Sequence, residues 1–190
     1  MSVLQSLLIT PSHYTSLDCV QKLPTILDSH NIHYAMYRCD DFSLAKEFAY
    51  QCKEHSVYAI LNAPFDISHP LSILDCAILQ DFDGIHLKGA YFSHIDSIVR
   101  HYSGIVGFSA HSVDEVYKAL DNGAHYCTLS PIFFTPNKAT PLGIESLHSL
   151  SIEARKKTFA LGGIVSDFYI DKIAHIEHIK GFGSIRYFFP

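Results

Sequence analysis

The chain has 190 residues, of which 48% are hydrophobic and 17% are charged. This balance is typical of one globular domain with a substantial core and excludes a disordered chain. The formal net charge is −5 and the Lys and Arg residues occur singly, so we expect no nucleic-acid surface. Any bound anion must then be held by local geometry rather than by overall charge.

Short apolar runs alternate with longer amphipathic stretches along the chain. This alternation predicts parallel βαβ units, which can form either an open doubly wound sheet or a closed barrel. The number and similar length of the units favour an α/β fold with one compact (β/α)₈ TIM barrel, a single domain over residues 1–190. The expected strands are residues 4–9, 32–37, 57–61, 84–87, 104–108, 125–129, 158–161 and about 179–182.

Two of the expected helices begin with a Ser side-chain acceptor followed three residues later by a carboxylate. Ser93 with Asp96, and Ser112 with Glu115, therefore predict helix N-caps. Only residues 183–190 follow the eighth strand, so we expect the eighth helix to be truncated or missing. Either the aromatic tail or a partner subunit would then cover the flank, and an uncovered apolar flank would favour a homodimer.

The cysteines are dispersed and form no C-x-x-C pair. They are Cys19, Cys39, Cys52, Cys76 and Cys127. This pattern argues against a disulfide scaffold and a structural zinc site, and it favours buried thiols in a reducing compartment. The N-terminal segment lacks the features of a signal peptide, and no apolar run approaches the length of a membrane span. We therefore expect a cytoplasmic protein that does not contact a membrane.

Glycine-rich turns follow the last two predicted strands, where barrels commonly hold phosphate. Gly162 and Gly163 follow the seventh strand, and the segment from Gly181 to Arg186 surrounds the end of the eighth. Glycine lets backbone N–H groups approach an anion closely, and Arg186 can add positive charge. The sequence therefore predicts a phosphate site at these turns.

Other polar residues lie at the expected strand ends. His111 follows the fifth strand and is the best candidate for a general acid–base, because imidazole titrates near neutrality. The loop after the sixth strand carries hydroxyls and a lysine, and we interpret it as either a phosphate-reaching lid or a rigid proline loop. The expected substrate contacts are Arg38, Asn62, His86, Ser130, Thr135 and Lys138, with His86 also suited to packing or hydrogen bonding at the barrel mouth.

Four segments in order resemble the thiamin phosphate synthase/TenI family, over residues 32–185. They are Asp83-Gly-Ile-His-Leu87, Gly107-Phe-Ser-Ala-His-Ser112, Ser130-Pro-Ile-Phe-Phe-Thr-Pro-Asn-Lys138 and Leu161-Gly-Gly-Ile164. The resemblance implies a thiamin-pathway barrel. Synthases of the family join a pyrimidine methyl diphosphate to a thiazole phosphate with Mg²⁺, whereas TenI-like tautomerases shuttle a proton on a carboxythiazole phosphate without metal. The resemblance also places the thiazole phosphate on Gly162, Gly163, Ile185 and Arg186, and the tautomerase histidine at His111.

The departures from the synthase pattern all fall on the metal and diphosphate half of the site. Asp40 replaces a lysine, Ala63 replaces one metal carboxylate and Tyr91 aligns with the second. Losing both carboxylates weakens the case for Mg²⁺, so we expect no metal ligands and no cofactor, with Mg²⁺ required only if the chain is a synthase. Two further departures are Met36 in place of a glutamine and Asn137 in place of a lid hydroxyl.

Three hypotheses follow from these observations. The first is a TenI-like protein that binds a small phosphorylated thiazole and relays a proton through His111. The second is a divergent thiamin phosphate synthase. The third is a catalytically silent barrel that binds a ligand or regulates a partner.

Overall fold

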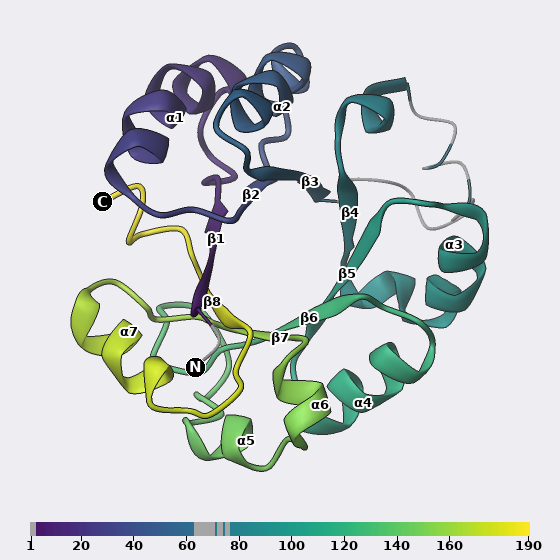
Figure 1. Cartoon of the computed structure of the whole chain (residues 1–190), viewed down its shortest axis with the longest axis vertical. Coiled ribbons are helices and arrows are strands. Elements are labelled where there is room, and N and C mark those ends of the chain that lie inside the picture. Colours follow the sequence, from purple (N-terminus) through teal and green to yellow (C-terminus); the bar gives the residue numbers. More distant parts are fainter. Residues whose placement is uncertain (1–2, 63–70, 72–73, 75–76) are drawn as a thin grey trace.

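The computed structural model describes residues 3–62, 71, 74 and 77–190. Its parallel strands pair in sequence order, and β1 closes the barrel by pairing with β8 (Figure 1). This confirms the predicted (β/α)₈ barrel. The strands are β1 (Gln5–Ile9), β2 (Tyr34–Tyr37), β3 (Tyr58–Asn62), β4 (Gly84–Leu87), β5 (Ile105–Ala110), β6 (Tyr126–Leu129), β7 (Thr158–Leu161) and β8 (Gly181–Ser184).

Helices surround the barrel (Figure 1), so most strand residues are buried on both faces. The α-helices are α1 (Ser16–Ser29), α2 (Ala45–Glu54), α3 (Ile95–His101), α4 (Val113–Asp121), α5 (Glu145–His148), α6 (Ile152–Arg155) and α7 (Asp167–Ala174). Two 3₁₀ helices, η2 (Ala77–Asp81) and η3 (Gly89–His94), lie before and after β4. None of the helices in the described residues is long and apolar enough to cross a membrane.

The two predicted helix N-caps have different outcomes. The Ser112 side chain accepts the Glu115 N–H at 3.1 Å at the start of α4, as predicted. Ser93 does not cap α3, because it lies inside η3 and α3 follows directly after His94 without a side-chain cap. The 3₁₀ turn runs on into the helix, so the chain has no extended residue at which a cap could form.

The inside of the barrel and the space outside it contain separate apolar clusters. Seven buried residues fill the barrel interior: Leu7, Ile9, Tyr34, Met36, Ile60, Tyr126 and Phe159. Aromatic rings dominate this interior, and the Tyr34 and Phe159 rings meet edge to face at 5.5 Å. The larger cluster lies between the strands and the helices. The filled interior leaves the C-terminal ends of the strands as the place for a cavity.

Residues 185–190 form a turn instead of an eighth helix, as expected. The segment after β8 runs toward α1, across the flank between α7 and α1 (Figure 1). Phe188 and Phe189 are buried there. Phe188 stacks on Phe182 with ring centroids 6.1 Å apart, and Phe189 meets Tyr14 of the loop before α1 at 5.6 Å. The chain's own aromatic tail therefore covers this flank.

Candidate functional site

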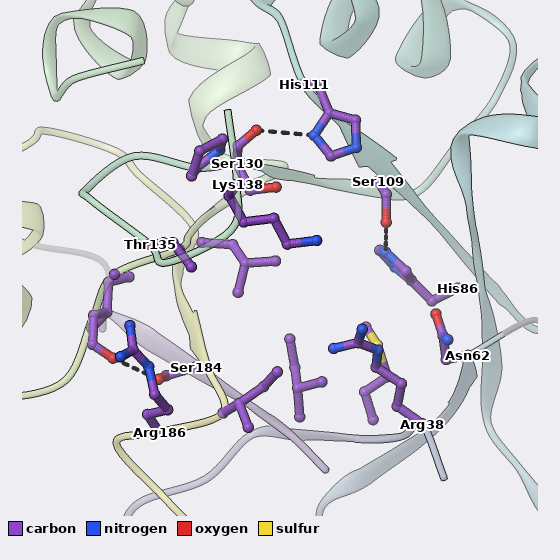
Figure 2. A pocket seen from close by; sticks show the side chains of 18 of the residues that line it. Arg38, Asn62, His86, Ser109, His111, Ser130, Thr135, Lys138, Ser184 and Arg186 are labelled. Atoms are coloured by element: carbon purple, nitrogen blue, oxygen red, sulfur yellow. Dashed lines mark hydrogen bonds between the residues drawn. The ribbon is translucent and has the colours of Figure 1, made fainter. Parts of the chain in front are cut away.

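A cavity of about 530 Å³ opens at the C-terminal ends of the strands, and every strand or the loop after it contributes to its lining. Figure 2 shows Lys138 reaching into this cavity from one side and Arg38 facing it from another. The structure brings together here all the residues predicted from the sequence: Arg38, Asn62, His86, His111, Ser130, Thr135, Lys138, Gly162, Gly163, Ile185 and Arg186.

The turn after β7 depends on two glycines with left-handed backbone angles. Gly162 has φ of +96° and Gly163 has φ of +75°. A Cβ added at Gly162 would lie 2.8 Å from the Pro131 Cα atom, and one added at Gly163 would lie 2.6 Å from the Phe134 carbonyl oxygen. Both the backbone conformation and the close approach of the loop after β6 therefore require glycine here.

Backbone donors line the cavity at the ends of β7 and β8. We call residues 162–164 and 184–186 the β7–β8 turns. Within the described residues, the N–H groups of Gly163, Ile164, Ile185 and Arg186 have no protein acceptor. Backbone N–H groups seldom lack a partner unless water or a ligand supplies one. Together with the Arg186 guanidinium, these donors form a set suited to a phosphate monoester.

Ser184 joins the two turns and was missed in the sequence. Its buried hydroxyl donates to the Ile164 carbonyl oxygen at 2.6 Å and accepts the Tyr187 N–H at 3.1 Å. The side chain therefore fixes the turn after β8 relative to the turn after β7 (Figure 2). Because the eighth strand runs two residues further than expected, Ser184 ends the strand rather than lying in the loop.

His111 has a defined tautomer at the edge of the cavity. Its Nδ1 atom lies 3.0 Å from the Ser130 carbonyl oxygen (Figure 2). A carbonyl only accepts, so Nδ1 carries the proton in this bond and the Nε2 lone pair remains available. The Glu115 carboxylate accepts the His111 backbone N–H at 2.7 Å and holds the residue at the start of α4. This arrangement suits a proton acceptor.

His86 is held differently and is the poorer proton carrier. Its Nδ1 lies 3.1 Å from the Tyr126 hydroxyl, and its Nε2 lies 2.8 Å from the Ser109 hydroxyl. Burial, with a smaller contribution from the nearby Arg38 charge, lowers the pKa of His86 to about 3. The ring is therefore neutral near pH 7, as expected of a hydrogen-bonding residue at the barrel mouth.

The loop after β6 is anchored at both ends. The Ile132 and Phe133 N–H groups donate to the carbonyls of Leu161 and Gly162, at 2.8 and 3.0 Å. The Leu142 N–H returns to the Pro131 carbonyl at 2.8 Å. These bonds fix the base of the loop, while Lys138 at its tip reaches into the cavity (Figure 2). The loop therefore has the fixed base of a rigid proline loop together with a lysine that reaches into the cavity, as expected of a phosphate-reaching lid.

The opposite side of the cavity carries two cations. Arg38 and Lys88 each follow the last residue of a strand, β2 and β4, and both also line a smaller cavity of about 140 Å³ beside the first. Asn62 of β3 lies in both linings as well. Within the described residues, no carboxylate forms an ion pair with either cation. We call Arg38, Asn62 and Lys88 the β2–β4 cluster; the sequence prediction had missed Lys88.

The described donor set on this side does not fit Mg²⁺. This ion prefers carboxylate and water oxygens, whereas the β2–β4 cluster offers two cations and an amide. Among the described residues, Asp40 is the one carboxylate in the smaller lining, and Tyr91 is buried in η3. No cluster of His, Cys, Asp and Glu suited to a metal occurs in the parts of the chain that the structure describes. Ala63, the other departure from the synthase pattern, lies outside the described residues.

Fold and cavity together define a (β/α)₈ barrel whose cavity opens where enzymes of this class place their sites. The chain belongs to the thiamine monophosphate synthase (TMP-TENI) family, whose model matches residues 7–176. This match confirms the resemblance noted in the sequence and places the chain in a family of thiamine biosynthesis.

Several curated relatives are named thiamine-phosphate synthase. One such protein of Prochlorococcus marinus is 32% identical over 150 residues, which are 74% of this chain and 40% of the relative. That of Bacillus cereus (strain B4264) is 35% identical over 114 residues, 59% of this chain and 47% of the relative. Across these curated relatives the aligned part spans from 33% to 62% of their own length.

A solved structure has the same fold. Thiamine phosphate pyrophosphorylase from Pyrococcus furiosus superposes with a TM-score of 0.71 over 96% of this chain and 85% of that protein, at 19% sequence identity. At this level of identity the likeness concerns the fold alone.

Proposed function

We propose that the chain binds a phosphorylated thiazole in thiamine biosynthesis, with the phosphate on the β7–β8 turns. The observation that carries this proposal is the set of backbone N–H groups at Gly163, Ile164, Ile185 and Arg186 that have no protein acceptor in the described structure. Donors fixed by the fold bind an anion without needing a positively charged protein. A thiamine-pathway role also suits the cytoplasmic location expected from the sequence.

The names of the relatives favour the coupling reaction over the proton transfer that was our first hypothesis. In that reaction the thiazole nitrogen bonds to the pyrimidine methylene carbon as diphosphate leaves. Arg38 and Lys88 can neutralise the departing diphosphate from the β2–β4 cluster, and Lys138 also reaches into the cavity. Because the described residues do not fit Mg²⁺, we propose no step through a metal. The coupling assay below, run with Mg²⁺ or with EDTA, measures whether the reaction requires one.

A second candidate reaction is supported by the geometry of His111. With Nδ1–H held by the Ser130 carbonyl, Nε2 can accept a proton from a thiazole phosphate and return it elsewhere on the ring. This reaction is the tautomerisation of a carboxythiazole phosphate, and it needs neither diphosphate nor metal.

Two assays on the same purified protein separate the candidates. One supplies hydroxymethylpyrimidine diphosphate and thiazole phosphate, with Mg²⁺ or with EDTA, and measures thiamine phosphate. The other supplies the carboxythiazole phosphate tautomer and follows its isomerisation. We expect turnover in one assay. Binding of thiazole phosphate without turnover in either would support the catalytically silent barrel, and no binding would contradict the proposal.

His111→Gln provides the matched test of the second candidate. If His111 carries the proton, this variant should lose at least about a hundredfold in isomerisation rate, which is the typical contribution of a general acid–base. His101→Gln on the outer side of α3 is the control, because its Nδ1 also meets a backbone carbonyl, that of Ser97 at 2.7 Å. Equal isomerisation rates for the wild type and His111→Gln would remove His111 from the mechanism.

A further inference from the structure

Two cysteines from different elements meet beside the β2–β4 cluster. Cys19 lies in α1 and Cys39 follows β2, and their Sγ atoms are 2.7 Å apart. This is closer than the about 3.5–4.0 Å at which carbon atoms pack. It exceeds the S–S bond of a disulfide by only about 0.7 Å. The two sulfur atoms therefore need to approach only slightly to form a bond.

The other described cysteines lack such a contact. Cys127 has its Sγ 3.9 Å from the Val116 carbonyl oxygen, and Cys52 is a buried residue of α2. Neither has a second sulfur within contact distance among the described residues. Cys52 and Cys127 are consequently internal controls for any chemistry specific to the pair.

The contacts of Cys39 differ from those of Cys19. The Thr10 hydroxyl oxygen accepts the Cys39 S–H at 3.5 Å and also the Arg38 backbone N–H at 2.8 Å. The hydrogen bond with Cys19, assisted by Thr10, lowers the pKa of the Cys39 thiol, whereas the same bond and burial raise the pKa of Cys19. Because Cys39 also lines the smaller cavity and Cys19 does not, Cys39 is the nucleophile of the pair and Cys19 the thiol that resolves it.

A small oxidant has a route to Cys39 but not directly to Cys19. Cys39 belongs to the lining of the 140 Å³ cavity, together with Ser12, Arg38 and Lys88. Cys19 is absent from that lining and is fully buried in the core. A molecule close to water in size, such as hydrogen peroxide, can enter this cavity, so attack occurs first on the sulfur that is the better nucleophile.

We propose that Cys19 and Cys39 form a reversible intramolecular disulfide, with a hydroperoxide as the oxidant. The Cys39 thiolate attacks one peroxide oxygen, the O–O bond breaks, and Cys39 becomes a sulfenic acid as hydroxide leaves. The Cys19 sulfur then attacks the Cys39 sulfur, and the sulfenic hydroxyl leaves as water with the Cys19 proton. Overall two thiols and one hydrogen peroxide give one disulfide and two waters, and a dithiol reverses the change.

The disulfide would tie α1 to the end of β2. It closes the span from residue 19 to residue 39, and it removes the Cys39 S–H from its contacts with Thr10 and the Pro11 carbonyl. Arg38 is the neighbouring residue and shares the Thr10 hydroxyl, so the oxidised pair lies directly behind a cation of the β2–β4 cluster. Closing the span also raises the midpoint of thermal unfolding, because it restricts the unfolded chain.

The test treats the Cys76→Ser protein with hydrogen peroxide, so that the four remaining thiols are those described above. Free thiols are alkylated after denaturation, and peptides are analysed by mass spectrometry without reduction. We expect a cross-linked pair containing Cys19 and Cys39, the loss of two alkylated sites, and their recovery after treatment with dithiothreitol. Cys19→Ser should instead leave Cys39 as a sulfenic acid that dimedone traps.

Two results would overturn the proposal. One is a treated protein in which all four thiols are still alkylated. The other is oxidation of Cys52 or Cys127 at the rate of Cys39, which would show general damage rather than a paired site. Because the main measurement keeps both Cys19 and Cys39, it does not depend on how well either serine variant folds. Ser replacement of Cys127 should leave the cross-link intact.

Discussion

Gly163 illustrates how one residue serves both the fold and the proposed site. Gly163→Ala forces a side chain onto φ of +75° and places its Cβ 2.6 Å from the Phe134 carbonyl oxygen. We expect a loss of about 1–3 kcal/mol in the free energy of unfolding, measured by urea titration. Thiazole phosphate affinity, measured by calorimetry, should fall with it, because the turn that presents the backbone donors is displaced.

Gly89→Ala is the control for this change. Gly89 also lines the cavity, but an added Cβ there meets nothing within 4 Å. This variant should retain both stability and affinity. If Gly163→Ala binds thiazole phosphate as tightly as Gly89→Ala does, the phosphate does not lie on the β7–β8 turns.

The buried imidazole of His86 predicts an acid-sensitive fold. Its pKa is about 3 in the folded chain, against about 6.5 when exposed. Between these values the unfolded chain binds the proton and the folded chain does not, so stability is retained above pH 6.5 and lost as the pH falls toward 3. One such group contributes a slope of up to about 1.4 kcal/mol per pH unit. His86→Gln should flatten this slope in urea titrations between pH 4 and pH 6.5.

Tyr126→Phe distinguishes the effect of His86 titration on stability from the effect of its hydrogen bond to Tyr126. This variant removes the partner of Nδ1 while keeping the imidazole. It should lower the free energy of unfolding at every pH but keep the wild-type slope. A slope in His86→Gln as steep as that of the wild type would show that other groups cause the acid sensitivity.

The strand-end rule predicted much of the cavity lining because a barrel gathers the ends of all its strands. It was not applied to Lys88, one residue beyond the fourth expected strand. The signal was present, since Lys88 follows β4 as Arg38 follows β2. Ser184 was missed for a different reason, namely an error in the position of β8. The tautomer of His111 depends on the Ser130 carbonyl, which no sequence pattern places.

At the scale of elements, apolar runs located the first seven strands closely and misplaced the eighth. The prediction for β8 began at Ile179, but the strand runs from Gly181 to Ser184. Ile179 is buried in the turn before the strand, where its N–H meets the Ile176 carbonyl at 3.3 Å. Gly181 lacks a side chain because a Cβ there would overlap the Gln5 carbonyl oxygen of β1. A strand containing two glycines has a weak apolar pattern.

The aromatic tail packs its side chains into the flank between α7 and α1, so shortening them should behave as a core mutation. Phe188 is 3% exposed and packs against Phe182 and His30. Phe188→Ala should lower the free energy of unfolding by about 3–5 kcal/mol in urea titration. Phe168→Ala, at a ring that is 61% exposed, should change it by less than about 0.5 kcal/mol. Similar losses in the two variants would mean that the tail does not seal the flank.

At the scale of the whole molecule, the covered flank changes the reason for expecting a homodimer. The sequence argument was that a barrel lacking its eighth helix exposes an apolar surface. Because Phe188 and Phe189 are buried on this flank, the apolar surface is covered by the chain itself. A homodimer stays a prediction, which light scattering can test, but it now needs a different contact surface.

The charge distribution of the molecule leads to the last prediction. The chain has a formal net charge of −5, yet cations line its cavity on separate sides, with Arg186 at the β7–β8 turns and Arg38 with Lys88 at the β2–β4 cluster. Local charge should then hold two anions without a metal. In EDTA, Lys88→Gln should weaken inorganic pyrophosphate binding about tenfold, as expected for losing one charged hydrogen bond, and leave thiazole phosphate binding unchanged. Arg186→Gln should weaken thiazole phosphate binding and leave pyrophosphate binding unchanged.

Calorimetry with both ligands, at two salt concentrations, measures this crossed pattern. Lys53→Gln on the outer surface of α2 is the control for the loss of one positive charge. If Lys53→Gln weakens pyrophosphate binding as much as Lys88→Gln does, the effect comes from net charge and not from the cavity. If pyrophosphate binds the wild type only when Mg²⁺ is added, the β2–β4 cluster does not replace the metal.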